Sequence, residues 1–305
     1  MIAKQKIIIA TRQSRLALWQ AEWVKQHLLA KHPHLNILLL AKSTTGDRTP
    51  NISLATLGGK NLFTKELQQS VLSGEADIAV HSVKDLAAED HPGLCLASIL
   101  KREDARDVFI ANQFKQFSEL PLNAVVGTAS PRRQCQILAA RPDLQIKLLR
   151  GNVETRVAKL RQGEYDAIIL AAAGLKRLDM AAEITDYFAP DKIIPAIGQG
   201  AIGIECRADD AVIKSLVQTI NDHSTQLCVQ AERAVNVFLG GDCFTPIAAH
   251  ATQKDRQLFV TALVGTLDGS RIFVSKISGP DDKAYELGIQ AGRDLENQGA
   301  RAFLS

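Results

Sequence analysis

Four arginines in the stretch 127–156 stand where anion binding needs them, at two successive strand-to-helix junctions. At the first junction an apolar run ends at Thr128, Ser130 occupies the expected helix N-cap, and a proline takes the first helical position. Arg132 and Arg133 then fall in the first helical turn, where the helix dipole disfavours cations unless an anion lies close by. The junction therefore predicts N–H groups, hydroxyls and guanidinium groups around a bound anion.

The second junction repeats this layout. Residues 146–149 are apolar, a turn begins at Arg150, and Arg156 lies near the start of a helix predicted over 153–162. Guanidinium groups pair with carboxylates and phosphates in two-point geometry, so the two junctions predict a site for such anions at one sheet edge. The alternative is that the arginines are solvated surface residues, which four of them at two adjacent helix starts make the weaker explanation.

Strands and helices alternate along most of the chain, which predicts an α/β fold. The first strand, over 6–11, ends before Arg12, and Ser14 is the expected N-cap of a helix over 15–31. Arg12 thus stands at another strand-to-helix turn of the kind that the arginines above occupy.

A later strand, predicted over 75–81, leads directly to Lys84 and Asp85. Ligands of open α/β sheets bind beyond the carboxyl ends of the strands, so this lysine and this aspartate are placed for chemistry. An ordinary ion pair in a loop is the alternative.

A sequence echo indicates two lobes of similar plan. Residues 72–80, LSGEADIAV, and 161–169, RQGEYDAII, both read as a helix end, Gly-Glu, one residue, Asp and an apolar strand. Duplicated α/β lobes explain this better than chance convergence does. The charged residues 101–104 mark a crossing between the lobes, and the Gly-rich stretch 197–203 predicts a hinge with close backbone approach.

The last part of the chain has a different pattern. An amphipathic helix is predicted over 224–239, and two apolar runs, 257–265 and 271–277, flank an Asp-Gly pair that signals a type I′ turn. A helix over 281–297 closes the chain. We expect a small α/β domain.

Cys243 lies in this part, on a loop between a glycine pair and Pro246. Cysteines on such loops are exposed more often than cysteines in strands, although a structural free thiol would fit the spacing as well. The other four cysteines fall in predicted strands, at Cys95 and Cys206, or in predicted helices, at Cys135 and Cys228.

Composition narrows the class of protein. The 305 residues carry a net charge of only +3, and the five cysteines are odd in number without a Cys-x-x-Cys pair, which favours a reduced, cytoplasmic chain. Apolar segments are too short for a membrane-spanning helix or a signal peptide, and no metal-ligand spacing or P-loop occurs. Acids interspersed in the basic stretch and the lack of an aromatic stacking run argue against nucleic-acid binding.

Eight motifs, in order along residues 6–250, closely resemble those of the porphobilinogen deaminase (hydroxymethylbilane synthase) family. They are T-R-x-S-x-L-A at Thr11–Ala17, G-G-K-x-L-F at Gly58–Phe63, H-S-x-K-D at His81–Asp85, R-R-Q-C-Q at Arg132–Gln136, L-R-G-N-V-x-T-R at Leu149–Arg156, A-G-L-K-R-L at Ala173–Leu178, G-Q-G-A-I-G-I-E-C-R at Gly198–Arg207 and C-x-x-P at Cys243–Pro246.

The resemblance implies three α/β domains, of which the first two resemble type II periplasmic binding proteins and the third has an antiparallel sheet. We expect them at 4–100 plus 200–220, at 104–195, and at 222–305. It also implies a transferase of porphyrin and haem biosynthesis that joins four porphobilinogen molecules into hydroxymethylbilane with release of ammonia. A dipyrromethane primer would be held as a thioether to Cys243. The expected binding partner is an anionic pyrrole substrate, and neither nucleic acid nor a membrane is expected as a partner. The protein would be a cytoplasmic monomer.

Site roles follow from the resemblance, residue by residue. Asp85 would be catalytic, because a carboxylate stabilises the azafulvenium cation that remains when ammonia leaves the substrate. The cofactor-binding set would be Cys243, Lys84, Thr128, Ser130, Arg132 and Arg133, and the substrate-binding set Arg12, Ser14, Arg150, Arg156, Arg177 and Gln199, with no metal. Because pyrrole substrates carry an acetate and a propionate, we expect the arginines to line a solvent-filled cleft. The rival hypothesis is a two-lobe anion-binding protein without catalysis, which would need neither Asp85 nor Cys243.

Overall fold

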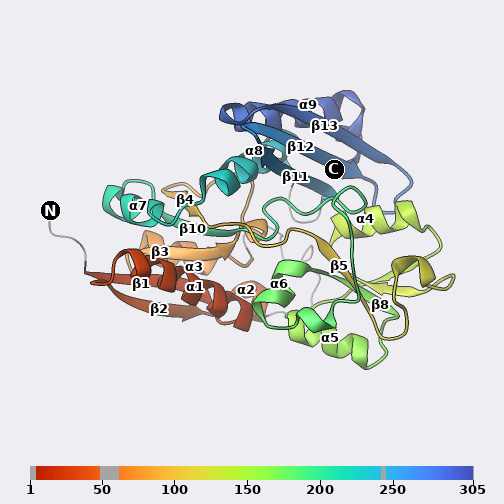
Figure 1. Ribbon diagram of the computed structural model, residues 1–305, viewed down its shortest axis with the longest axis horizontal. Coiled ribbons are helices and arrows are strands. Elements are labelled where there is room, and N and C mark those ends of the chain that lie inside the picture. Colours follow the sequence, from red (N-terminus) through yellow and green to blue (C-terminus); the bar gives the residue numbers. More distant parts are fainter. Residues whose placement is uncertain (1–4, 49–61, 242–244, 305) are drawn as a thin grey trace. The chain divides into compact units, whose positions relative to one another are not determined.

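The computed structural model describes residues 5–48, 62–241 and 245–304, which form an α/β protein with three sheets (Figure 1). The chain divides into two compact units. Unit 1 comprises Met1–Arg102 and Ala201–Gln226, and unit 2 comprises Glu103–Gly200 and Leu227–Ser305. Unit 1 holds one five-stranded sheet, whereas unit 2 holds a second five-stranded sheet and a three-stranded antiparallel sheet.

The sheet of unit 1 has the strand order β2-β1-β3-β10-β4. Its elements are β1 (Lys6–Arg12), α1 (Arg15–Lys31), β2 (Asn36–Lys42), α2 (Thr45–Arg48), α3 (Lys65–Leu72), β3 (Ile78–Ser82), β4 (Leu94–Ile99), β10 (Ile202–Arg207) and α7 (Ala211–Gln218). Strands β1, β2 and β3 are parallel, and β10 runs antiparallel between β3 and β4. The N-cap predicted at Ser14 is confirmed, because its side chain accepts a hydrogen bond from the N–H of Ala17.

The five-stranded sheet of unit 2 has the order β7-β6-β8-β5-β9. Its elements are β5 (Asp107–Ala111), β6 (Val125–Gly127), α4 (Pro131–Ala140), β7 (Gln145–Lys147), α5 (Val153–Arg161), β8 (Ala167–Ala171), α6 (Ala172–Arg177) and β9 (Asp186–Tyr187), with 3₁₀ turns at Phe117–Glu119 and Ala181–Glu183. Strands β6, β7 and β8 are parallel, and β5 runs antiparallel between β8 and β9.

The two five-stranded sheets therefore share one plan. In each sheet the fourth strand, β10 in unit 1 and β5 in unit 2, is the first strand after the chain has crossed from the other unit. The sequence echo marks equivalent positions in them. The Asp77 carboxylate accepts a hydrogen bond from the Ile8 N–H (2.8 Å), and the Asp166 carboxylate accepts one from the Val125 N–H (2.7 Å). The backbone N–H of each aspartate also donates to the carbonyl of the residue that its side chain holds. The echo thus reflects the same strand-to-strand link in two lobes.

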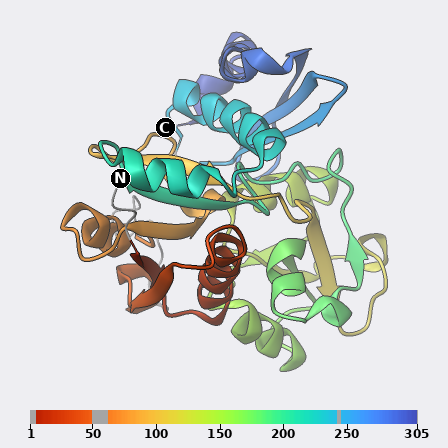
Figure 2. The same ribbon diagram turned by 60° about the vertical axis from the view of Figure 1, so that its left-hand side comes forward.

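The remaining elements of unit 2 form a C-terminal layer of helices packed on the three-stranded antiparallel sheet. They are α8 (His223–Leu239), which begins in unit 1, β11 (Ile247–Lys254), β12 (Gln257–Gly265), β13 (Ile272–Pro280), a 3₁₀ turn at Asp281–Lys283, α9 (Ala284–Asn297) and a 3₁₀ turn at Ala300–Phe303. Helix α9 lies across β12 and β13 (Figures 1 and 2). Apolar side chains of α8 and α9 form one core with one face of the sheet.

The predicted hairpin is correct, but its turn is not type I′. That turn needs a positive φ at both central residues, and only Gly269 has one, at 71°. The connection from β12 to β13 instead spans residues 266–271, where the N–H of Gly269 donates to the carbonyl of Thr266. Strand β11, which the sequence patterns did not predict, pairs with the other edge of β12.

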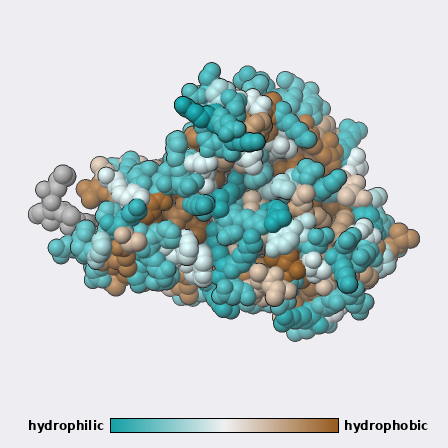
Figure 3. Space-filling view, viewed as in Figure 1, coloured by the Kyte–Doolittle hydropathy of each residue, from teal (hydrophilic) through white to brown (hydrophobic). Residues whose placement is uncertain are grey.

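The surface seen in Figure 3 is largely hydrophilic, with apolar side chains in small groups. Among the helices of residues 5–48, 62–241 and 245–304, none is long and apolar enough to cross a membrane.

Candidate functional site

The predicted site residues fall into two groups, one in each unit. In unit 1, Arg12, Ser14, Lys84 and Asp85 line one small cavity of about 80 Å³. They reach it from the end of β1, from the cap of α1 and from the 3₁₀ turn Val83–Asp85 that follows β3. Because β1 and β3 are parallel neighbours, their carboxyl ends meet at one sheet edge, as predicted for a ligand site.

Asp85 is the acid of this cavity, and the Arg12 side chain is close both to it and to an aromatic ring. The Arg12 guanidinium is 3.9 Å from the Asp85 carboxylate and 4.3 Å from the centre of the Phe63 ring. Both charged side chains remain partly exposed, at 22% and 33%. Partial exposure leaves them accessible to a ligand, and the weak contact between them costs little to rearrange.

A buried pair borders this cavity, because His81 is also one of its lining residues. The imidazole Nε2 of His81 is 2.9 Å from the Glu205 carboxylate, and both side chains are almost fully buried. The Gln68 amide donates to the same carboxylate at 3.1 Å. These contacts connect β3 to β10 and α3 directly beside the turn that carries Asp85, and residue patterns alone did not reveal them.

In unit 2 the first arginine junction has the predicted local structure. Ser130 caps α4, its hydroxyl accepting from the N–H of Arg133, and its own N–H donates to the hydroxyl of Thr128 at 3.2 Å. At the second junction Asn152 caps α5 by accepting from the N–H of Thr155 at 2.8 Å. The hydroxyls and the helix N-termini therefore lie at the positions that the sequence predicted.

The exposure expected for Arg132 and Arg133 is wrong. They are only 4% and 6% exposed, because both pair with Asp107, whose side chain is fully buried at the start of β5. Arg132 Nη1 donates to one carboxylate oxygen (2.6 Å), and Arg133 donates to the other through Nη2 (2.7 Å) and Nε (3.1 Å). The anion that the first turn of α4 requires is thus partly supplied by the protein itself.

The charges of this cluster do not cancel. Burial by itself raises the pKa of the Asp107 carboxyl, but the charges and hydrogen bonds of Arg132 and Arg133 outweigh burial and hold this pKa below its ordinary value. Burial lowers the pKa of the Arg133 guanidinium, and Asp107 opposes that shift. Two guanidinium groups facing one carboxylate leave one excess positive charge in a buried place.

The other predicted residues of unit 2 differ in exposure. Arg150 and Arg156 are half-buried, and Arg156 Nε donates to the Gly151 carbonyl at 2.8 Å. Arg177 is buried, and this burial lowers its guanidinium pKa to about 10. Its Nη2 donates to the Gly200 carbonyl at 2.7 Å, so Arg177 too does not line a solvent-filled cleft.

Gln199 belongs to the same buried cluster as Asp107. Its amide donates to the Asp107 carboxylate (3.0 Å) and to the Ala105 carbonyl (2.6 Å). Next to it, Gly200 has a φ of 86°, and a Cβ there would lie 2.4 Å from the Glu103 carbonyl oxygen. The close backbone approach predicted for the Gly-rich stretch is confirmed.

Cys243 lies outside the described residues, as does most of the G-G-K-x-L-F motif. The other cysteines are free thiols. Burial raises the thiol pKa of Cys135 and of Cys206 to about 12 each, which leaves them almost wholly protonated at neutral pH.

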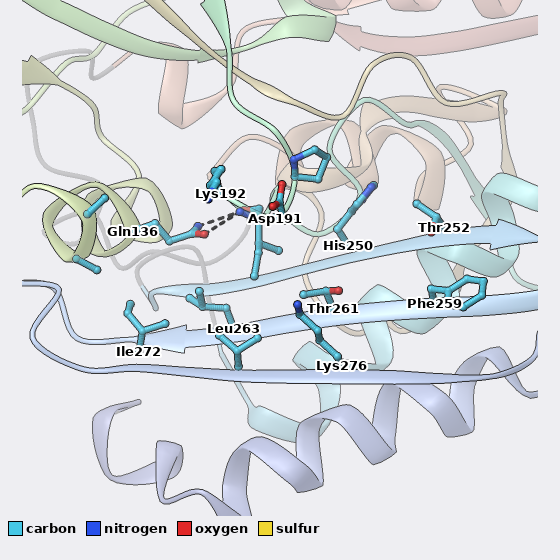
Figure 4. A pocket seen from close by; sticks show the side chains of 15 residues that line it. Gln136, Asp191, Lys192, His250, Thr252, Phe259, Thr261, Leu263, Ile272 and Lys276 are labelled. Carbon is cyan, nitrogen blue, oxygen red and sulfur yellow. Dashed lines mark hydrogen bonds between the residues drawn. The ribbon is translucent and has the colours of Figure 1, made fainter. Parts of the chain in front are cut away.

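A larger cavity, of about 1000 Å³, lies elsewhere in unit 2 (Figure 4). Its walls are the outer face of β11, β12 and β13, the end of α4, and residues 190–194. Gln136 points toward the backbone of residue 194 and accepts a hydrogen bond from that N–H. None of the predicted site residues within 5–48, 62–241 and 245–304 lines this cavity.

Asp107 is the functional candidate that sequence reasoning missed. An acid at the head of an apolar strand is a visible pattern, but its partners lie 25 and more positions away in the sequence. The first turn of α4 contains two arginines and no acid, so it needs a counter-charge from elsewhere in the chain. This need was the sequence signal that could have pointed to a buried acid such as Asp107.

The geometry defines an α/β protein with duplicated lobes and cationic groups at strand ends and helix starts. Two family models match the chain: "Porphobilinogen deaminase, dipyromethane cofactor binding domain" over residues 7–215, and "Porphobilinogen deaminase, C-terminal domain" over residues 226–297. Curated relatives named porphobilinogen deaminase from two strains of Coxiella burnetii are each 51% identical over 304 residues, covering 100% of this chain and 98% of the relative. Among solved structures, a periplasmic substrate-binding protein of an ABC transporter from Coxiella burnetii is 11% identical with a TM-score of 0.45, covering 74% of this chain and 96% of that chain.

The chain belongs to the porphobilinogen deaminase family, whose members are transferases of tetrapyrrole synthesis. The rival hypothesis of a binding protein without catalysis is thereby set aside.

The residues of unit 2 fit the dipyrromethane group that the family implies. Arg132 Nε is buried and has no hydrogen-bond acceptor among the described residues. Such orphaned donors are rare in folded proteins because each costs desolvation energy without compensation. A ligand carboxylate would both accept from this N–H and neutralise the excess positive charge of the cluster.

Proposed function

We propose that this chain joins four porphobilinogen molecules head to tail on a dipyrromethane group attached to Cys243, with release of one ammonia for each molecule added. Water then cleaves the bond between the tetrapyrrole and the dipyrromethane group, which releases hydroxymethylbilane and leaves the primer on the protein. The observation that carries the proposal is the cavity of unit 1, where Arg12, Ser14, Lys84 and Asp85 meet. Its volume of about 80 Å³ is below the roughly 300–1,000 Å³ of typical ligand pockets. It therefore suits the carboxylate-bearing end of a pyrrole rather than a whole substrate.

Cationic groups in this cavity bind and orient the substrate. The exposed ammonium of Lys84 and the partly exposed guanidinium of Arg12 pair with the acetate and propionate groups of the pyrrole. The Ser14 hydroxyl, held at the start of α1, can donate to the same carboxylates. In unit 2, Arg150 and Arg156 are half-buried at the second junction and bind further carboxylates of the growing chain in the same way.

Asp85 acts on the reacting centre. When ammonia leaves the aminomethyl group, positive charge develops on the substrate pyrrole, and a carboxylate within the cavity stabilises that charge. The same carboxylate can accept the proton that the pyrrole ring loses after the new carbon–carbon bond has formed. The 3₁₀ turn after β3, closed by the N–H of Leu86 donating to the Val83 carbonyl, holds the backbone that carries this carboxylate.

Thr128, Ser130, Arg132 and Arg133 hold the dipyrromethane group, together with Lys84. When bound, this group supplies the free pyrrole position to which the first substrate is added. Cys243 is the proposed attachment point because the other thiols with shifted pKa values, those of Cys135 and Cys206, are buried and poorly ionised. We further propose that the protein works as a monomer in the cytoplasm, a reducing compartment in which the four described cysteines would remain free thiols.

Incubation of the purified chain with porphobilinogen tests the activity. We expect four molecules of ammonia to be released for each linear tetrapyrrole formed. We also expect the intact mass of the protein to exceed the mass calculated from its sequence by two porphobilinogen units less two ammonias. Saturable binding of porphobilinogen without ammonia release would instead identify an anion-binding protein. An unmodified chain that works at full rate without a lag would remove the covalent primer from the proposal.

A further inference from the structure

The cluster around Asp107 gives this acid a role that goes beyond charge compensation. Its carboxylate accepts four hydrogen bonds, from Arg132, from Arg133 twice, and from Gln199, at 2.6–3.1 Å. Its side chain is fully buried. A buried carboxylate with this many donors has one stable position, and so do the groups that it holds.

Each arginine is fixed at two points, of which Asp107 is one. The Nη1 of Arg132 also donates to the Ile194 carbonyl (2.7 Å), and the Nη1 of Arg133 to the Ile169 carbonyl (2.9 Å). Two anchors per guanidinium set the direction of its remaining N–H bonds. One of these is the buried Nε of Arg132, which has no acceptor within the part of the chain that the structure describes.

The cluster also ties the arginines to distant parts of unit 2. Asp107 directly follows the segment by which the chain enters this unit, whereas Ile194 and Gln199 lie on the segment by which it leaves. The arginines themselves belong to the first turn of α4. The orientation of the two guanidinium groups therefore depends on three segments that Asp107 holds together.

We propose that Asp107 is a positioning residue, which orients Arg132 and Arg133 to receive a carboxylate of the dipyrromethane group and leaves one positive charge for it. This inference rests on the proposed function. A second acid in the cluster would cancel the excess positive charge and so remove the attraction for a ligand carboxylate. Without any acid, the two guanidinium groups would repel each other and would have no fixed directions. One acid for two arginines is the arrangement that binds a single further carboxylate.

The variant Asp107→Asn tests this role, with Asp77→Asn as the matched control. Asp77 is also a buried aspartate, 5% exposed, but its carboxylate holds the backbone of Ile8 in unit 1. Each protein is produced in cells that cannot make porphobilinogen, and its folding is checked by urea unfolding. Porphobilinogen is then added, and intact mass follows the appearance of the adduct over time. After priming, kcat and KM for porphobilinogen are measured.

We expect Asp107→Asn to gain the adduct about 10- to 150-fold more slowly, the range for a lost charge-assisted hydrogen bond. Once primed, the variant should differ more in KM than in kcat, because Asp107 does not touch the reacting atoms. Asp77→Asn should lose stability but take up the primer at the wild-type rate. Asp107→Glu, which keeps the charge but moves it by one methylene, should lie between Asp107→Asn and the wild type.

Three outcomes overturn the inference. One is a folded Asp107→Asn protein that is primed at the wild-type rate, and another is an Asp77→Asn protein whose priming slows as much. Where Asp107→Asn does not fold, a wild-type priming rate in Asp107→Glu is the third. A wild-type protein that never gains the adduct contradicts the proposed function itself, and is thereby distinguished from a failure of the role of Asp107.

Discussion

Replacement of Arg133 by Leu separates a buried arginine from the exposed ones that the sequence patterns led us to expect. The side chain makes three hydrogen bonds, two to the Asp107 carboxylate and one to the Ile169 carbonyl, and it is 6% exposed. Leucine fills part of the volume but makes none of these bonds. Of its hydrogen bonds to the described residues, the Asp107 carboxylate would then keep those from Arg132 and Gln199.

The magnitude follows from this loss. Removal of one partner of a buried ion pair costs about 3–5 kcal/mol of the free energy of unfolding. The two remaining donors to Asp107 place the expected cost at the lower end, about 3 kcal/mol. For a compact unit of this size, each kcal/mol shifts the midpoint of thermal unfolding by about 2–4 °C, so Tm should fall by about 6–12 °C.

Two control variants make the measurement specific. Arg161 forms an ion pair with Glu183 on the surface of the same lobe, with its side chain 63% exposed, and Arg161→Leu should change the free energy of unfolding by less than about 1 kcal/mol. Arg150→Leu, at a half-buried position, should stay folded and lose affinity for porphobilinogen, by about 1.5–3 kcal/mol for each charged hydrogen bond that is lost. Far-UV circular dichroism in urea and on heating gives the stabilities, and calorimetric titration gives the affinities.

The reasoning would be refuted by an Arg133→Leu protein as stable as Arg161→Leu. That result would mean that Asp107 is satisfied without Arg133, and the buried cluster would lose its structural basis. Wild-type affinity and turnover in Arg150→Leu would remove the second junction from the binding site.

Four further changes have definite expected outcomes. Asp85→Asn should bind porphobilinogen almost normally but turn over about 10²–10³-fold more slowly, and weak binding with normal turnover would make it a binding residue. Cys243→Ser should be folded, free of the adduct and inactive, whereas Cys135→Ser should stay active; an adduct on another cysteine in the peptide map would move the attachment site. Gly200→Ala should lower stability by about 1–3 kcal/mol, because its Cβ would lie 2.4 Å from a backbone carbonyl oxygen, and an unchanged urea midpoint would contradict this close approach of the two crossing segments. Since the arginines lower the pKa of Asp107, its contribution to stability should be present above the unfolded pKa of about 3.9 and be lost as pH falls further, so the acid limb of a plot of Tm against pH should be flatter in Asp107→Asn than in the wild type.

The sequence by itself determined two helix caps, the duplication of the lobes and the family. The caps at Ser14 and Ser130 were predicted because an N-cap depends on a side chain and an N–H only three residues apart. The cap at Asn152 obeys the same local rule, although the sequence patterns predicted only a turn there. The duplication of the lobes was visible for a similar reason. Asp77 and Asp166 each mark the start of a strand, and the same short pattern recurs around both.

Only the tertiary structure decided which arginines are buried. In the sequence, Arg132 and Arg133 have the pattern of exposed cations in the first turn of a helix. In the folded protein they are buried against Asp107, which precedes Arg132 by 25 positions, and Gln199, which follows Asp107 by 92 positions, binds the same carboxylate. Likewise, β10 takes its place between β3 and β4 although it lies more than a hundred positions after them. Such contacts follow from how the whole chain closes its sheets, because burial and ion pairing between distant segments leave no periodic pattern in the sequence.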